Sequence, residues 1–471
     1  MSFRRSLGPL DATMLVAGSM IGSGIFIVSA GIAGMVQTPG LLLGVWVLTG
    51  FLTLIAALSY GELAGMMPEA GGQYVYLREA FGPLAGFLYG WTLFTVIQTG
   101  TIAAVAMAFA KFTAVLIPGL AESQILFHLG PVSVSAAQIV AIASIIVLTA
   151  LNARGVKLGK IVQNIFTSTK LVAVIGLAVV GIAIGVGSEA WTSNMSAFWN
   201  APVLGADGPS SILAVIAVAM VGTIFSSDAW NNITFVASEV QNPKRTIPLS
   251  LFWGVLIVTG LYLLVNVAYL SLLPILGSPE GADVMSRGIQ YAVNDRVGTA
   301  AAEVMFGTNG AFIMAILIMV STFGCNNGLI LSGARAYYAM AVDGLFFAKA
   351  RTLNGNDVPA TALWIQCLWA GVLCLSGQYG NLLDYVVMAV LLFYILTIVS
   401  IFRLRRLRPD AERPYKAIGY PVLPALYVVL ASAICVCLLI YKPGYTWPGV
   451  GLVALGLPVY FIWTKGKGRT A

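Results

Sequence analysis

The chain of 471 residues contains twelve long apolar stretches, and these constrain its fold more than any other feature. A membrane-spanning helix needs roughly 20 predominantly apolar residues, and each stretch is close to that length. Charged residues make up only 9% of the chain, against about 25% in soluble domains, which excludes a soluble enzyme of several domains. No segment alternates apolar and polar residues as barrel strands do. We therefore predict an all-α polytopic membrane protein with spans near residues 9–34, 40–60, 84–110, 136–152, 161–187, 211–237, 249–274, 311–341, 359–376, 382–402, 421–441 and 448–464.

The basic residues are unevenly distributed over the predicted loops. Of the 25 Lys and Arg residues, 20 lie on the same side of the membrane as the N-terminus, and one, Lys170, falls within a span. The positive-inside rule then places both termini in the cytoplasm. The net charge of +7 is explained by basic loops that lie beside anionic lipid. We therefore expect the lipid bilayer as a partner, and no nucleic acid.

Two segments between the spans are long enough to hold structure of their own. Residues 61–83 are rich in Gly and Tyr and are expected to form a cytoplasmic loop. Residues 275–307 lie on the outer side and are expected to contain an amphipathic helix over about residues 282–305.

The cysteines and the histidine exclude several kinds of chemistry. All five cysteines lie in apolar stretches, without a CxxC pair, and the single histidine, His128, lies in a polar loop. We therefore expect no metal and no cofactor. The sequence contains no HExxH, GxSxG or GxxxxGK[ST] motif, so we predict neither an intramembrane enzyme nor an ATP-driven pump.

The first span is interrupted by Gly22-Ser23-Gly24, within a run that also includes Gly18. Each glycine weakens a helix by about 1 kcal/mol relative to alanine. Near mid-membrane, irregular backbone is tolerated only where it faces protein or a water-filled cavity. Close packing between helices is the alternative explanation for these glycines.

The sixth span is interrupted by Ser226, Ser227, Asp228, Asn231 and Asn232. An intramembrane aspartate indicates a functional site, although it could also cap a re-entrant helix. The two breaks lie five spans apart, so repeats of five spans would have inverted topology. Interrupted helices at matching positions of two halves indicate the binding site of a secondary transporter.

Lys170 lies in the middle of the fifth span. A lysine close to a helix end extends its amine to the membrane surface. About nine residues separate Lys170 from the cytoplasmic end of this span, so we expect its amine to bind carbonyl groups inside the protein.

Three blocks of sequence resemble the amino acid–polyamine–organocation (APC) transporters, and in particular their L-type amino acid transporter branch. They are GSMIGSGIF at 18–26, SYGEL at 59–63 with PEAGGQYVY at 68–76, and FSSDAWN at 225–231 followed by FVASE and NPKRTIP. The resemblance implies a LeuT-type fold in one domain over residues 1–471, with 12 transmembrane helices, of which helices 1 and 6 are discontinuous. It further implies a 5+5 inverted repeat, about 9–187 and 211–402, and two extra helices at about 421–464.

The resemblance also implies a binding site for the backbone groups of an amino acid. The amides of Ser23, Gly24 and Ile25 would direct the positive end of a half-helix at the substrate carboxylate. The substrate ammonium would donate hydrogen bonds to carbonyl groups of both interrupted spans. Those of the first span belong to Ser19, Met20 and Ile21, and those of the sixth to Phe225 and Ser226. Phe225 would close over the substrate, or else be an ordinary core residue. The substrate side chain would enter a pocket near Asp228, Trp230 and Asn231.

The same resemblance implies that Lys170 occupies the position of the sodium ion of related transporters. Its amine would act as a tethered cation between spans 1 and 8, paired with the hydroxyls of Ser321 and Thr322. This implies independence from sodium. If the buried amine gives up its proton, Lys170 would also couple transport to protons.

The resulting prediction is sodium-independent secondary transport of a broad range of neutral L-amino acids, as an exchanger or a proton-coupled symporter. The alternative is a cationic amino acid or polyamine antiporter that uses Asp228. Animal members form a disulfide to a glycoprotein through a cysteine in the loop after span 3, but residues 118–131 contain none. We therefore expect no such partner, and a location in a bacterial inner (plasma) membrane.

Overall fold

The computed structural model describes residues 5–129, 132–200, 211–376 and 379–465. Within these residues, nine helices are long and apolar enough to cross a membrane, and the bent pair of α1 and α2 makes a tenth span. The helices at the predicted spans are α1 (Pro9–Met20) with α2 (Gly24–Val36), α3 (Pro39–Met66), α5 (Pro83–Thr92) with η1 (Leu93–Ile97) and α6 (Gln98–Leu116), α7 (Ala136–Ala153), α8 (Val156–Gly185), α10 (Ile212–Ser226) with α11 (Asn232–Phe235), α12 (Pro243–Leu272), α15 (Thr308–Val342), α16 (Ala360–Ser376), α17 (Tyr379–Leu407), α18 (Val422–Tyr441) and α19 (Pro443–Lys465).

The fold is therefore the helical membrane protein that the sequence predicts. α10 and α16 are shorter apolar helices, so the count of twelve spans stays a prediction, as does the division into two inverted repeats. Both predicted interruptions are present, because α1 and α2 are separate helices and α10 ends at Ser226.

Two expectations for the segments between spans are wrong. Residues 61–83 are largely helical, because α3 continues to Met66 and α4 spans Gln73–Phe81. The amphipathic helix over 282–305 is not continuous. It is divided into α13 (Val284–Arg287), η4 (Val293–Asp295) and α14 (Val297–Phe306), since Gly288, Asn294 and Asp295 have positive φ angles that no α-helix adopts.

The remaining elements are short and lie between spans. They comprise η2 (Pro118–Leu120), an antiparallel hairpin of β1 (Ile125–Leu129) and β2 (Val132–Ser135), α9 (Glu189–Ser196), η3 (Ala237–Glu239) and η5 (Ala348–Arg351). Together with α4 and with α13, η4 and α14 above, they account for the elements outside the spans in the described part of the chain.

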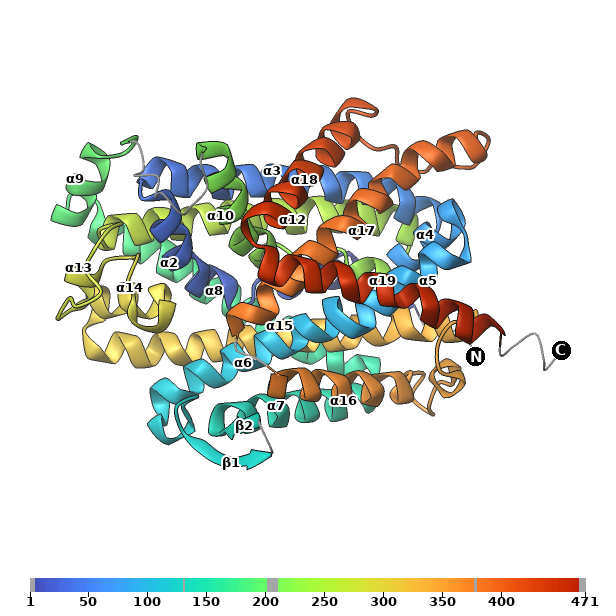
Figure 1. Cartoon of the computed structure of the whole chain (residues 1–471), viewed down its shortest axis with the longest axis horizontal. Coiled ribbons are helices and arrows are strands. Elements are labelled where there is room, and N and C mark those ends of the chain that lie inside the picture. The colour runs from blue at the N-terminus through green and yellow to red at the C-terminus, as the bar shows by residue number, and fades with distance from the viewer. Residues whose placement is uncertain (1–4, 130–131, 201–210, 377–378, 466–471) are drawn as a thin grey trace.

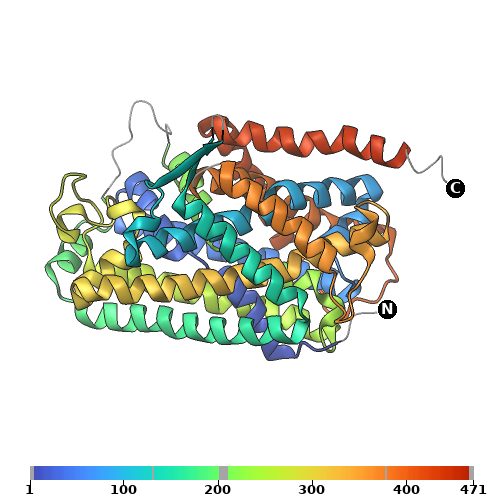
Figure 2. The same cartoon turned by 90° about the horizontal axis from the view of Figure 1, so that it is seen from below.

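The long helices run side by side along one axis of the molecule (Figure 1). One group packs α3 and α1 against α12, with α10 against α2 and α3. A second group packs α15 against α6, α7 and α8, and α8 also contacts α12. Helix α19 lies along the outside of the bundle (Figure 2). This arrangement brings the interrupted helices α1, α2 and α10 into the interior.

The two ends of the bundle differ in composition. Elements α9, α13 and α14 gather at one end, whereas α4 and the start of α1 lie at the other (Figure 1). The second end also carries Arg78, Lys244, Arg335, Arg405 and Arg413. We call it the basic end, and the first the opposite end.

Candidate substrate site at the two helix breaks

The first break separates α1 from α2 by an extended turn. Helix α1 ends at Met20, Ile21 has extended backbone angles, and α2 begins at Gly24, with a bend of 41° between the two helices. A Cβ atom on Gly24 would lie 2.1 Å from Ser226 Oγ, and one on Gly22 would lie 3.1 Å from Cys325 Sγ. Glycine is therefore required at position 24, where the two broken helices meet, whereas a side chain at position 22 would press against Cys325 of α15.

The second break separates α10 from α11. Helix α10 ends at Ser226, and Ala229 adopts a φ of +65°, an uncommon conformation for a residue with a side chain. The chain resumes as the single turn α11 and then as η3. Strained backbone of this kind is held in place by its surroundings and is concentrated at functional sites.

A buried cavity of about 20 Å³ lies between the two breaks. Its volume corresponds to about one water molecule, so a larger ligand can enter only after the helices around it move apart. The first break contributes Ser19, Met20, Gly22, Ser23 and Gly24, the second contributes Phe225, Ser226, Asp228 and Ala229, and Thr101, Val105 and Cys325 complete the lining.

The carbonyl groups at the breaks already accept hydrogen bonds from neighbouring helices. The hydroxyl of Tyr262 on α12 lies 3.0 Å from the Met20 carbonyl oxygen and 3.1 Å from that of Ser226. The Tyr269 hydroxyl donates to the Ile25 carbonyl at 3.2 Å. The thiol of Cys325 donates to the Ser19 carbonyl at 3.0 Å. Tyr262 thus joins both breaks through one oxygen atom.

Sequence reasoning missed these donors. Tyr262, Asn266 and Tyr269 follow the spacing i, i+4, i+7 and so lie on one face of α12. Asn266 Oδ1 accepts from the hydroxyl of Ser29 on α2 at 2.7 Å. A buried tyrosine hydroxyl usually finds a hydrogen-bond partner, so a polar stripe in an apolar span is the signal that was available.

Lys170 is completely buried, and its amine donates to carbonyl groups at the end of α1. The bonds go to the carbonyl oxygens of Gly18 and Ile21, the second at 2.7 Å. The C-terminal end of a helix carries partial negative charge, which favours a cation there. The amine therefore holds α8 against the first break.

Of the two hydroxyls expected to pair with Lys170, one faces the break. Ser321 Oγ lies 3.3 Å from the carbonyl oxygens of both Ile21 and Gly22. Thr322 instead donates to the Ile318 carbonyl of its own helix at 2.9 Å. Ser321 and Lys170 thus share the Ile21 carbonyl, and the expectation for Thr322 is corrected, because adjacent helical residues point about 100° apart.

Asp228, Trp230 and Asn231 do not line one pocket in this conformation. Asp228 lines the cavity between the breaks, but Trp230 and Asn231 each line a separate cavity of about 20 and 10 Å³. Asp228 borders all three cavities. Of the three residues, only Asp228 borders the cavity between the breaks.

Each of these side chains has a partner on another helix. Asp228 Oδ1 accepts from the Tyr394 hydroxyl at 2.5 Å. Trp230 packs against the rings of Tyr60 and Tyr394, with centroids 4.7 and 5.2 Å away. Asn231 donates to Gln73 Oε1 at 3.0 Å, and Gln73 donates to Thr397 at 2.9 Å. The second break is thereby fixed to α4 and α17.

Comparison with known proteins gives consistent matches over nearly the whole chain. The profile of the family described as amino acid permease matches residues 7–460. The mouse b(0,+)-type amino acid transporter 1 is 28% identical over 99% of this chain and 89% of its own length. The human large neutral amino acids transporter small subunit 2 is 29% identical over 98% and 81%. The human Asc-type amino acid transporter 1 is 28% identical over 98% and 82%.

Proposed function

The chain belongs to the amino acid permease family of the APC superfamily, and on that premise we propose that it carries neutral L-amino acids across the membrane by sodium-independent alternating access. It is a multi-pass membrane transporter rather than an enzyme. The observation that carries the proposal is the meeting of two helix breaks around one buried cavity, since substrates of such transporters bind between interrupted helices.

In this proposal, different groups of the site bind the carboxylate and the ammonium of the substrate. The N-terminal end of α2 would hold the carboxylate through the amides of Ser23, Gly24 and Ile25, because helix N-termini favour anions. The Ile21 carbonyl already accepts from Lys170 and Ser321, which uses both of its lone pairs. The substrate ammonium is therefore directed to the carbonyls of Ser19, Met20 and Ser226.

Phe225 and the packing of the helices account for closure over the substrate. Phe225 is buried and borders the cavity, where its ring would cover a bound amino acid. Helix α12 packs against α1 and α3, and α10 packs against α2 and α3. In this proposal the five helices move as one body. Their movement against α6, α8 and α15 would open the cavity on either side in turn.

Lys170 supports independence from sodium. Its amine supplies a fixed positive charge at carbonyls that a sodium ion would otherwise coordinate. Exchange and proton-coupled symport both agree with this arrangement. We expect Lys170→Met to abolish transport, and Lys111→Met, a lysine on α6 away from the breaks, to retain it.

A cationic amino acid or polyamine antiporter is the second candidate. Asp228 favours it, because a carboxylate at the substrate cavity would attract a second positive charge. The Tyr394 hydroxyl occupies one of its oxygens, and this supports neutral substrates as the first candidate. Asp228→Asn should abolish cation uptake only if the second candidate is correct.

Counterflow into proteoliposomes tests both candidates. Vesicles would be preloaded in turn with alanine, serine, leucine, arginine, lysine and putrescine, with and without sodium or a pH gradient. Exchange of neutral amino acids without sodium supports the proposal. Exchange restricted to arginine, lysine or putrescine supports the second candidate, and dependence on sodium contradicts the role of Lys170.

The positive-inside rule further supports cytoplasmic termini in a plasma membrane, with the basic end facing the cytoplasm. The expectation that no glycoprotein is attached by a disulfide is also part of the proposal. All five cysteines are free and lie in helices. Non-reducing electrophoresis of the chain from its native membrane would reveal such a partner.

A further inference from the structure

A second, much larger cavity lies at the basic end, away from the helix breaks. Its volume is about 520 Å³, and it is bordered by α3, α12 and the segment 408–421 that connects α17 to α18. None of its lining residues lines the cavity between the breaks. A cavity of this size is large enough for an organic ligand.

The lining of this cavity combines two chemistries. Lys244 and Arg245 lie in the first turn of α12 and form a basic mouth. Leu249 and Phe252 line the cavity further along the same helix, and Ile418 lines it from the connecting segment. Arg245 and Phe252 are seven residues apart, which is about 10 Å along a helix. The cavity therefore suits a ligand with an anionic head and an apolar tail.

The basic mouth is available to a ligand. The side chain of Lys244 is 47% exposed and forms an ion pair of 2.6 Å with Glu412, which is 74% exposed. An ion pair between such exposed groups contributes little free energy, so an anion can replace Glu412. Arg245 is also exposed.

The apolar part of the cavity continues onto the surface that faces lipid. Leu249, Trp253, Leu256 and Ile257 are large exposed side chains of α12, and Val422 of α18 is exposed beyond Ile418. In a membrane protein this surface contacts acyl chains, and tryptophan is enriched at the membrane interface. The occupant would therefore enter from the bilayer rather than from water.

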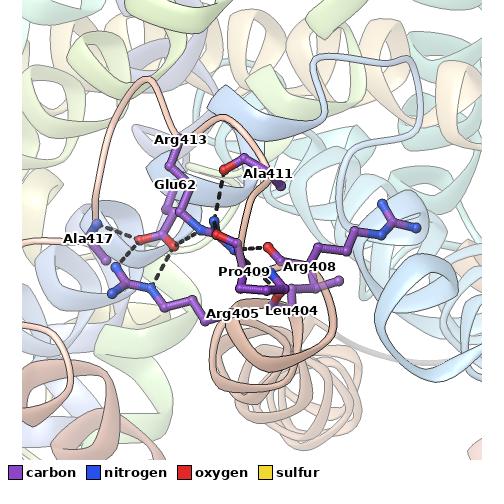
Figure 3. Close-up of polar contacts among 8 residues, drawn as sticks. All are labelled: Glu62, Leu404, Arg405, Arg408, Pro409, Ala411, Arg413 and Ala417. Carbon is purple, nitrogen blue, oxygen red and sulfur yellow. Dashed lines mark hydrogen bonds and ion pairs between the residues drawn. The ribbon is translucent and has the colours of Figure 1, made fainter.

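The outer wall of the cavity is fixed by the buried carboxylate of Glu62, at the end of α3 (Figure 3). Arg405 donates to both oxygens of Glu62, at 2.9 and 2.7 Å, and the Ala417 amide donates to Oε2 at 2.7 Å. Arg413 lies 3.4 Å from Oε1 and also donates to the carbonyls of Pro409, Ala411 and Arg408. The wall is thus preformed, which lowers the cost of binding.

We propose that this cavity binds one anionic phospholipid from the leaflet at the basic end. The phosphate lies against Lys244 and Arg245, and an acyl chain follows Leu249, Phe252 and Ile418. Anionic lipids of the cytoplasmic leaflet are attracted to basic residues at this depth. The lipid would join α12 to the segment that Glu62 anchors.

Native mass spectrometry of the full chain in detergent tests the proposal. The chain would be titrated with phosphatidylglycerol and with phosphatidylcholine of the same acyl chains. We expect one phosphatidylglycerol to bind more tightly than phosphatidylcholine. Each basic residue near a membrane surface accounts for about a fivefold change in affinity, so Lys244→Gln/Arg245→Gln should weaken phosphatidylglycerol binding roughly 30-fold.

Two further variants separate charge from shape. Lys349→Gln/Arg351→Gln removes two basic residues of η5 outside the cavity and should leave binding unchanged. Leu249→Trp fills the apolar part while retaining both charges, and should weaken both lipids. Equal binding of the two lipids, or an equal loss in the η5 variant, would overturn the proposal. Displacement of phosphatidylglycerol by glycerol phosphate at similar concentration would overturn it in favour of a simple anion site.

Discussion

Different kinds of contact hold the helices together at the two ends of the molecule. At the basic end, Glu239 of η3 pairs with Arg335 of α15 at 2.8 Å, and both side chains are buried. At the opposite end, the Asn194 side chain of α9 donates to the carbonyls of Leu270 and Leu273 at 2.7 and 2.9 Å. The basic end is thus closed by buried charges and the opposite end by neutral hydrogen bonds.

This difference affects the free energy that is lost when the contacts at each end are broken. The Glu239 carbonyl also accepts the amides of Ser6 and Leu7, so one residue ties the N-terminal segment to the second helix break. Removing one member of a buried ion pair leaves a buried charge without its partner, which costs about 3–5 kcal/mol. Removing a neutral hydrogen-bonding group costs less, about 1–3 kcal/mol. The contacts at the basic end are therefore the more costly ones to break.

Removing one member of the buried pair should have the largest effect. Arg335→Met leaves Glu239 charged and buried, and we expect a loss of about 3–5 kcal/mol in stability. Thermal unfolding in detergent would measure it. The double variant Glu239→Gln/Arg335→Met should recover part of the loss, since no unpaired charge remains. A single variant as stable as the wild type would show that the pair does not close this end.

Glu62→Gln should have the next largest effect. The amide keeps the shape of the side chain but loses the charge that Arg405 and Arg413 share. We expect a loss of about 1.5–3 kcal/mol, the usual contribution of charge-assisted hydrogen bonds. Limited proteolysis within residues 408–421 would report release of the segment. Unchanged cleavage would mean that packing alone holds the segment.

Asn194→Ala removes hydrogen bonds at the opposite end and should lower the stability by less. The variant removes bonds to two carbonyls and to the Ile275 amide. We expect a loss of about 1–3 kcal/mol, because one neutral side chain satisfies these buried groups. The same thermal assay compares it directly with Arg335→Met. A larger loss than for Arg335→Met would reverse the comparison between the two ends.

Acid should weaken the basic end slightly through Glu79 of α4. Hydrogen bonds from Arg408, and then from Arg78, lower the pKa of Glu79 below its ordinary value of about 4.5. Its stabilising contribution is therefore complete above the unfolded pKa and is lost as the pH falls through the lower, folded pKa. Glu79 is partly exposed, so the effect should be below about 1 kcal/mol.

Comparing the melting temperature of the wild type with that of Glu79→Gln between pH 6 and pH 3 measures this contribution. The difference between the two proteins should shrink below about pH 4.5. A difference that stays constant over this range would exclude a charged Glu79 as its source.

Some features of the site can be predicted from the sequence because the interior of a membrane tolerates little irregular backbone and few charged side chains. Gly22-Ser23-Gly24 and Asp228 indicated the two breaks, since irregular backbone and a carboxylate are costly in lipid. Lys170 stood out for the same reason. By contrast, Tyr262 and Tyr394 belong to apolar spans, and their roles appear only where their hydroxyls meet Met20, Ser226 and Asp228.

The sequence by itself determined the class of fold and the places where helices are interrupted, because both depend on the chemistry of local segments in lipid. Its motifs also indicated the family. The tertiary structure decided which side chains meet at those places. Ser321 faces the first break while its neighbour Thr322 bonds within its own helix. Glu62 meets Arg405 and Ala417 across more than 340 residues. Such contacts depend on the rotation of each helix against its neighbours, which the packing of the whole bundle sets.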